Sequence, residues 1–137
     1  MSTGRVYIAE PWASLILSGA KVIETAHIRL PAQFIGHWLD VQAAGGLRLG
    51  RVKFSGWRRY SSAEEFDSEH LLHHVPKGNR FHFEARRQTF GWKVEAAEAY
   101  EPVKGPAMRS QYRLELSRSL IKSKPPGGGR EVVATLA

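Results

Sequence analysis

Residues 10–25, EPWASLILSGAKVIET, form the stretch around which the rest of the chain is organised. Pro11 suits the first turn of a helix, where its missing N–H is not needed. An apolar face at the spacing i, i+3, i+4 is formed by Trp12, Leu15 and Ile16. Gly19 is typical of the left-handed residue that ends a helix. The stretch therefore predicts a short helix over residues 11–18, followed by an extended segment.

Two charged residues, Lys21 and Glu24, stand among apolar neighbours just after this helix. Charges beside a buried edge need partners, and such places are often functional sites. Because residues three apart point to opposite faces of a regular strand, the two side chains meet only if Lys21 belongs to the turn and the strand starts at Val22. We take both as candidate catalytic residues, with an ion pair that only stabilises the turn as the alternative.

The stretch PWASLILSGAKVIET resembles the opening motif of ASCH domains, members of the PUA-like superfamily. That motif runs roughly P-W-A-x-x-I-x-x-G-x-K-x-x-E-x-R. The positions that agree with it are Pro11, Trp12, Ala13, Ile16, Gly19, Lys21 and Glu24. The final arginine is absent, because position 26 is Ala26 and the nearest arginine is Arg29. Weaker likenesses to later family segments extend the resemblance from about Val6 to Leu116.

The resemblance implies an α+β chain, with a PUA-like small mixed or antiparallel β-barrel and peripheral helices. Members of the family are linked to RNA binding, to ribonuclease action and to removal of the acetyl group from acetylated cytidine. We therefore expect a domain over residues 1–117 and, from the run of prolines and glycines, a flexible basic tail over residues 118–137. The barrel mouth, beside Lys21 and Glu24, would hold the base or nucleotide.

Alternating apolar residues predict the strands of this domain. The segments expected to be extended are 5–9, 21–25, 36–43, 49–57, 80–84, 90–100 and 111–116. A second helix is expected to begin at Ser61 or Ser62, since two glutamates follow in its first turn and three histidines lie near its end.

The charge balance points to a polyanionic partner. The chain of 137 residues has 20 Lys and Arg against 13 Asp and Glu, a net charge of +7, and arginine is the commoner cation. The planar guanidinium suits phosphate, so RNA or a nucleotide is the expected partner. The candidate RNA-binding residues are Arg29, Arg51, Lys53, Arg58, Arg59, Arg86 and Arg87. The alternative is a surface that net charge merely keeps soluble.

Several classes of protein are excluded by composition. The chain has no cysteine, so it has neither disulfides nor thiolate metal ligands. His70 and His74 have a metal-ligand spacing, but no HExxH pattern accompanies them, so we expect no metal and no cofactor. No run approaches the roughly 20 apolar residues of a membrane span. We expect a cytoplasmic protein without a membrane partner, and leave its oligomeric state open.

Two functions remain open for the cleft around Lys21 and Glu24. The first is an RNA-binding or nucleotide-binding module. The alternative is a ribonuclease or a modified-nucleoside amidohydrolase, in which Lys21 serves as a cation or base and Glu24 as a base, with His27 as a weaker candidate for proton transfer. In the acetylcytidine amidohydrolases of the family that this chain resembles, a threonine stands at the position of Glu24. This chain has a glutamate there, and the adjacent Thr25 is expected to face the other way. Ribonuclease action therefore ranks above amidohydrolase action.

Overall fold

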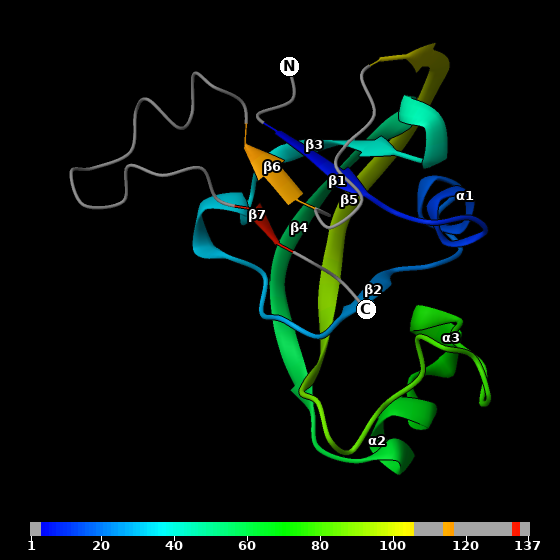
Figure 1. Cartoon of the computed structure of the whole chain (residues 1–137), viewed down its shortest axis with the longest axis vertical. Coiled ribbons are helices and arrows are strands. Elements are labelled where there is room, and N and C mark those ends of the chain that lie inside the picture. The colour runs from blue at the N-terminus through cyan, green and yellow to red at the C-terminus, as the bar shows by residue number, and fades with distance from the viewer. Residues whose placement is uncertain (1–3, 106–113, 117–132, 135–137) are drawn as a thin grey trace.

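Two long antiparallel strands, β4 (Leu47–Tyr60) and β5 (Thr89–Lys104), run almost the whole length of the molecule (Figure 1). The computed structural model describes residues 4–105, 114–116 and 133–134. Irregular pairing between Lys53 and Gly56 and between Arg48 and Gly50 interrupts the β4–β5 ladder. Such irregularities bend and twist a strand pair, so the two strands curve together around the core.

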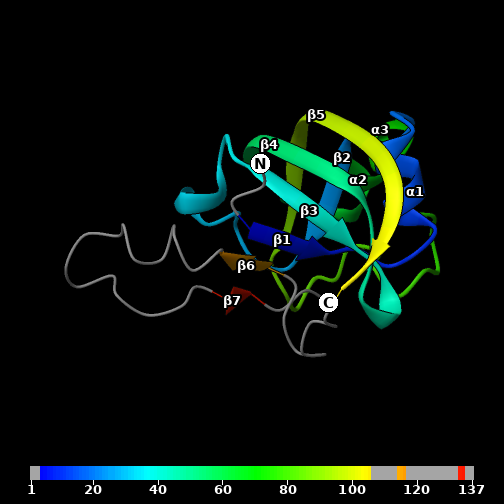
Figure 2. The same cartoon turned by 90° about the horizontal axis from the view of Figure 1, so that it is seen from above.

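A mixed sheet of seven strands forms around this pair, in the order β2-β5-β4-β3-β1-β6-β7. The remaining strands are β1 (Gly4–Tyr7), β2 (Ile23–Ala26), β3 (Trp38–Gln42), β6 (Leu114–Leu116) and β7 (Val133–Ala134). Only the β1–β3 pair is parallel in the described part of the chain. The sheet is strongly curved (Figure 2), but its edge strands β2 and β7 are not neighbours, so it is open rather than a closed barrel.

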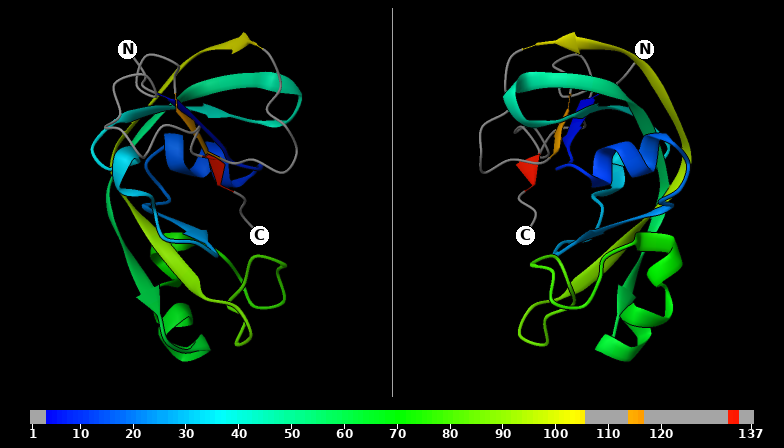
Figure 3. Two further views of the ribbon diagram at one scale, coloured as in Figure 1. Left: turned by 60° about the vertical axis from the view of Figure 1, so that its left-hand side comes forward. Right: turned by 90° about the vertical axis from the view of Figure 1, so that its right-hand side faces the viewer.

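Three short α-helices accompany the sheet. Helix α1 (Trp12–Leu17) buries Ala13 and Ile16 and packs against β4 and β5 (Figure 3). Helices α2 (Ala63–Ser68) and α3 (His70–His73) follow β4 and lie at the end of the sheet away from β1 and β3 (Figure 1). Short 3₁₀ turns occur at Ala32–Phe34 and Ala44–Gly46. None of the helices in the described residues is long and apolar enough to cross a membrane.

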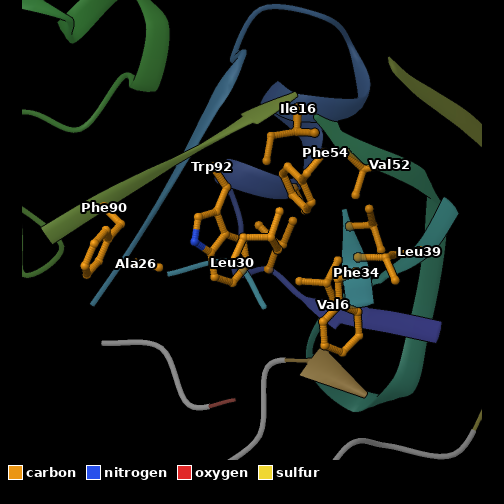
Figure 4. Close-up of a cluster of buried hydrophobic side chains, with 13 residues drawn as sticks. Val6, Ile16, Ala26, Leu30, Phe34, Leu39, Val52, Phe54, Phe90 and Trp92 are labelled. Carbon is orange, nitrogen blue, oxygen red and sulfur yellow. The ribbon is translucent and has the colours of Figure 1, made fainter. Parts of the chain in front are cut away.

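The core lies between α1 and the curved sheet. Trp92 and Phe54 are fully buried, and their rings meet edge to face with centroids 5.6 Å apart (Figure 4). A second, smaller cluster of Tyr60, Phe66 and Val75 lies beneath α2 and α3. Trp12 packs against both clusters, so α1 connects the two ends of the molecule.

Most of the expected elements are present. The helix expected over residues 11–18 is α1, and Ser62 caps α2 by accepting a hydrogen bond from the N–H of Glu65. The expected α+β class, with a mixed sheet and peripheral helices, is confirmed. The strands expected at 5–9, 21–25, 36–43, 49–57 and 90–100 correspond to β1 to β5, of which β4 and β5 are longer than expected. The tail expected over residues 118–137 lies outside the described residues except for β7.

The strand expected at residues 80–84 is wrong. Arg80 to Glu84 form turns and irregular backbone, although apolar and polar residues alternate there. Phe81 and Phe83 pack on the second cluster, and Asn79 Oδ1 accepts a hydrogen bond from the N–H of Phe81. No strand of the described sheet pairs with this segment. The alternation in RFHFE therefore comes from Phe81 and Phe83, which pack against the core from a loop. A strand would bury the same two residues, so the pattern does not distinguish the two structures.

Candidate functional site

Lys21 and Glu24 come together because the chain turns before β2 begins. Gly19, with φ of +87°, ends α1, and the N–H of Lys21 bonds back to the carbonyl of Leu15. The strand starts only at Ile23, so Lys21 is released from strand alternation. Its Nζ lies 3.5 Å from Glu24 Oε1, which confirms that the two charges can meet.

The ammonium group of Lys21 connects three elements. Lys21 is only 1% exposed, and its Nζ donates a hydrogen bond to the backbone carbonyl of His73 at the end of α3. The same Nζ lies 5.1 Å from the centroid of the Trp12 ring in α1, within reach of a cation–π interaction. A buried charge is tolerated only when such partners replace water. Lys21 therefore joins α1 and α3 to the start of β2.

The side chain of Glu24 is nearly as buried as that of Lys21, and it also binds a backbone N–H. It is 3% exposed, and its Oε1 accepts a hydrogen bond from the N–H of Thr25 at 3.3 Å. Since β2 is an edge strand, an amide there has no second strand to bind. The carboxylate supplies an acceptor at this edge while remaining beside the ammonium.

These two residues line a narrow cleft. Its walls are Ala9, Trp12, Lys21, Glu24, Thr25, Val75 and Phe81. The cavity volume is about 10 Å³, about the room that one water molecule needs. Thr25, the residue that follows Glu24 in β2, also lines the cleft, although alternation along a strand predicts that its side chain faces the other way. Phe81, which comes from the loop after α3, was not expected from the sequence.

His73 supports the carbonyl that receives the ammonium. Its Nε2 donates to the carbonyl of Phe66 at 2.7 Å, its Nδ1 accepts from the N–H of Val75 at 2.9 Å, and its ring stacks on Phe66 at 4.0 Å. Burial lowers the pKa of His73 to about 4. The neutral ring is thus a structural part of the turn that positions the Lys21 acceptor, which its place among the helix-end histidines did not indicate.

The two histidines at the metal-ligand spacing both lie close to backbone carbonyls. Nδ1 of His70 lies 3.3 Å from the carbonyl of Val75, and the Nε2 of His74 lies 2.8 Å from the carbonyl of Ala20. No group of three or more metal-ligating side chains occurs within the described residues.

Three of the seven candidate RNA-binding residues are already paired with carboxylates. Arg51 Nε lies 2.5 Å from Glu98. Lys53 Nζ lies 3.9 Å from Glu95. Arg58 binds two acidic side chains of the segment that contains α2, Glu65 and Glu69. These cations are therefore largely neutralised within the sheet and its neighbouring helix.

The other four candidates are exposed, and they form no ion pair within the part of the chain that is described. They are Arg29, Arg59, Arg86 and Arg87. All four lie at the end of the sheet where β2 and β4 end and β5 begins. At this end, Phe90 of β5 pairs in register with Arg59 of β4 on one side and with Ala26 of β2 on the other. Trp57 lies at the same end, 37% exposed, with the guanidinium of Arg29 5.8 Å from its ring centroid. Four exposed arginines without an ion-pair partner in the described residues thus lie at one end of the sheet, together with an exposed aromatic ring.

His27 lies at this end as well, beyond the Lys21 cleft. Its Nδ1 is 2.9 Å from the carbonyl of Gln88, and it lines a second hollow with Thr25 and Phe81. The structure therefore separates His27 from the Lys21–Glu24 pair, although both border the same edge strand.

Comparison with solved structures identifies the fold. A crystal structure of a serine-to-alanine mutant of an ASCH protein from Zymomonas mobilis matches with a TM-score of 0.69 and 13% identity, over 88% of this chain and 93% of that one. A crystal structure of ASCH from the same organism matches with a TM-score of 0.63 and 14% identity, over 98% and 87% of the two chains. No protein-family model and no curated protein matches the sequence. The chain thus has an ASCH-like fold.

We predict that the buried pair is energetically coupled. Lys21→Met should lower the free energy of unfolding by about 3–5 kcal/mol, because Glu24 is left buried without the ammonium. The double variant Lys21→Met/Glu24→Gln should lose less than the sum of the single variants, by about 1–3 kcal/mol, in urea unfolding experiments. Glu24→Gln serves as the matched single variant, since its amide oxygen still accepts from Thr25. Strict additivity of the two changes would contradict the coupling.

We also predict that His73 makes stability depend on pH. The unfolded chain binds a proton at His73 below its ordinary pKa of 6.5, whereas the folded chain does so only near pH 4, so the unfolded state gains protons first as the pH falls. Stability should therefore fall between pH 6.5 and 4, by roughly 1–3 kcal/mol from this residue. His73→Gln, which does not titrate, should flatten that part of the curve. Parallel curves for the two proteins would contradict the assignment.

Proposed function

We propose, with the ASCH-like fold as premise, that this protein binds single-stranded RNA or a nucleotide through the end of the sheet that contains Lys21, Glu24 and the unpaired arginines. The observation that carries the proposal is the sorting of charge. Arg51, Lys53 and Arg58 have carboxylate partners, whereas the exposed arginines at the cleft end have none among the described residues. Cations left without internal partners are the ones available to phosphate.

The exposed ring of Trp57 fits the same role. Aromatic faces stack with bases of any sequence, at roughly 1–3 kcal/mol per base. Trp57 meets Phe90 edge to face at 5.5 Å, which holds the indole in place, and Arg29 lies over its ring. A base on or beside this ring would bring the neighbouring phosphates to Arg29 and Arg59.

The Lys21–Glu24 cleft would receive one nucleotide. An ammonium and a carboxylate side by side offer a donor and an acceptor, which together match the edge of a nucleobase. The cleft has about the volume of one water molecule, so a lining side chain has to move when a base enters, and Phe81 is the one that we expect to move. Phe81 belongs to a segment without helix or strand, where such a movement disturbs no backbone ladder.

Fluorescence anisotropy with a labelled single-stranded RNA of mixed sequence tests this proposal. The affinity should fall as salt rises, because binding releases counterions. Arg59→Gln should weaken binding by roughly three- to tenfold and reduce the salt slope by about one phosphate contact. Arg51→Gln, the matched control, should change binding little, since Glu98 already neutralises that arginine. Equal effects of the two variants, or affinity independent of salt, would contradict the proposal.

A hydrolase at the same cleft is the second candidate, and the position of Thr25 favours it. Thr25, Lys21 and Glu24 line one cleft. A hydroxyl nucleophile beside a carboxylate base and an ammonium has the groups that acyl transfer requires, and the same base and cation suit RNA cleavage.

Separating the RNA on a denaturing gel after the binding experiment decides between the two candidates. If the wild-type protein shortens the RNA and the Glu24→Gln variant leaves it intact, the result would support a ribonuclease. Release of acetate from acetylated cytidine, lost in Thr25→Val, would support an amidohydrolase. If the RNA remains intact and acetylated cytidine is unchanged, the binding module stands alone.

A further inference from the structure

A second hollow continues the Lys21–Glu24 cleft along the edge of β2. It is lined by Thr25, Ala26, His27, Phe81 and Thr89. Thr25 and Phe81 line both hollows, so the two hollows are neighbours. The second hollow lies toward the exposed arginines, since His27 bonds to Gln88, which directly follows Arg87.

The hydroxyl of Thr89 is the unusual group in this hollow. Thr89 is 1% exposed, and its Oγ1 is buried without a hydrogen-bond partner among the residues that the structure describes. Leaving a buried hydroxyl unpaired costs on the order of 1–3 kcal/mol, so buried polar groups are nearly always satisfied. Valine would fill the same position in β5 at no such cost, which makes the hydroxyl a candidate ligand-binding group.

His27 offers a complementary atom to the same hollow. The carbonyl of Gln88 can only accept, so the Nδ1 of His27, 2.9 Å away, is the protonated nitrogen. In the neutral ring Nε2 is then an acceptor. The residues that line the hollow thus supply two polar groups: the Thr89 hydroxyl, which can donate and accept, and the Nε2 of His27, which can accept.

The lining of the hollow restricts what it can bind. It contains no lysine, arginine or carboxylate, so a phosphate would find no counter-charge inside and belongs with the arginines outside. Its cavity volume is about 0 Å³, against about 10 Å³ for the neighbouring cleft, so a ligand group enters only when the lining side chains move, and a second base is too large. A small neutral group with both a donor and an acceptor fits the chemistry, and a sugar hydroxyl is such a group.

We propose that this second hollow binds the ribose 2′-hydroxyl of the nucleotide whose base occupies the Lys21–Glu24 cleft, with Thr89 and His27 as its partners. The 2′-hydroxyl both donates and accepts, and it is the atom by which a protein distinguishes RNA from DNA. The hollow is therefore the element that makes the site selective for ribonucleotides. This inference rests on the proposed nucleotide binding, and entry of the sugar requires the same movement of Phe81.

The test compares two labelled single strands of identical base sequence, one of RNA and one of 2′-deoxynucleotides with uracil retained. The wild-type protein should prefer the RNA. Thr89→Val should weaken RNA binding by roughly five- to twentyfold, because one buried hydrogen bond is lost, and leave the affinity for the deoxy strand unchanged. Thr89→Ser, which keeps the hydroxyl, should retain the preference for RNA.

The stability of the free protein provides a second readout. Thr89→Val removes an unsatisfied buried hydroxyl and keeps the β-branched shape, so its melting temperature should equal or exceed that of the wild type. A lower melting temperature would show that the hydroxyl serves the fold, and would overturn the inference.

The outcomes also separate this inference from the proposed function. If the wild type binds neither strand, both fail. If it binds both strands equally, or if Thr89→Val weakens both alike, nucleic-acid binding stands and the ribose site is overturned.

Discussion

The contact between the Lys21 ammonium and the backbone carbonyl of His73 is the interaction on which the site depends. It joins the turn after α1 to the end of α3, across 52 residues of sequence. The buried charge requires this partner together with Glu24 and the face of Trp12. Because each of these partners comes from a different element, the cleft exists only when α1, β2 and α3 are all in place.

The length of β4 and β5 gives the protein two ends with different roles. One end of the pair lies with β3 and β1 around the main core, and the other extends to α2, α3 and the loop that contains Phe81 (Figure 1). The second cluster beneath the helices is small, with Tyr60, Phe66 and Val75 as its buried members. A small cluster beside a loop without regular structure is the part of a fold that opens at least cost, which suits the end where a ligand enters.

The fold determines which of the basic side chains have carboxylate partners and which do not. Along the middle of the sheet, carboxylates of β5 face the cations of β4, and Glu65 and Glu69 hold Arg58. At the open end, the exposed arginines have no such partners in the described residues, and they adjoin Trp57 and the two hollows beside β2. Four of the candidate cations are thereby available to a polyanion at the end of the sheet where the edge strand β2 and its two hollows lie.

Local sequence determined the α1 helix, its glycine end, the main strands and the pairing of Lys21 with Glu24, because each depends on residues within a few positions. The motif also predicted the ASCH-like fold. Tertiary structure alone decided the rest. Folding placed the His73 carbonyl on Lys21 and bent residues 80–84 into a loop from which Phe81 lines the cleft. It also sorted paired from unpaired arginines and buried the Thr89 hydroxyl. These features join residues distant in sequence, so they depend on the packing of whole elements, which no local pattern encodes.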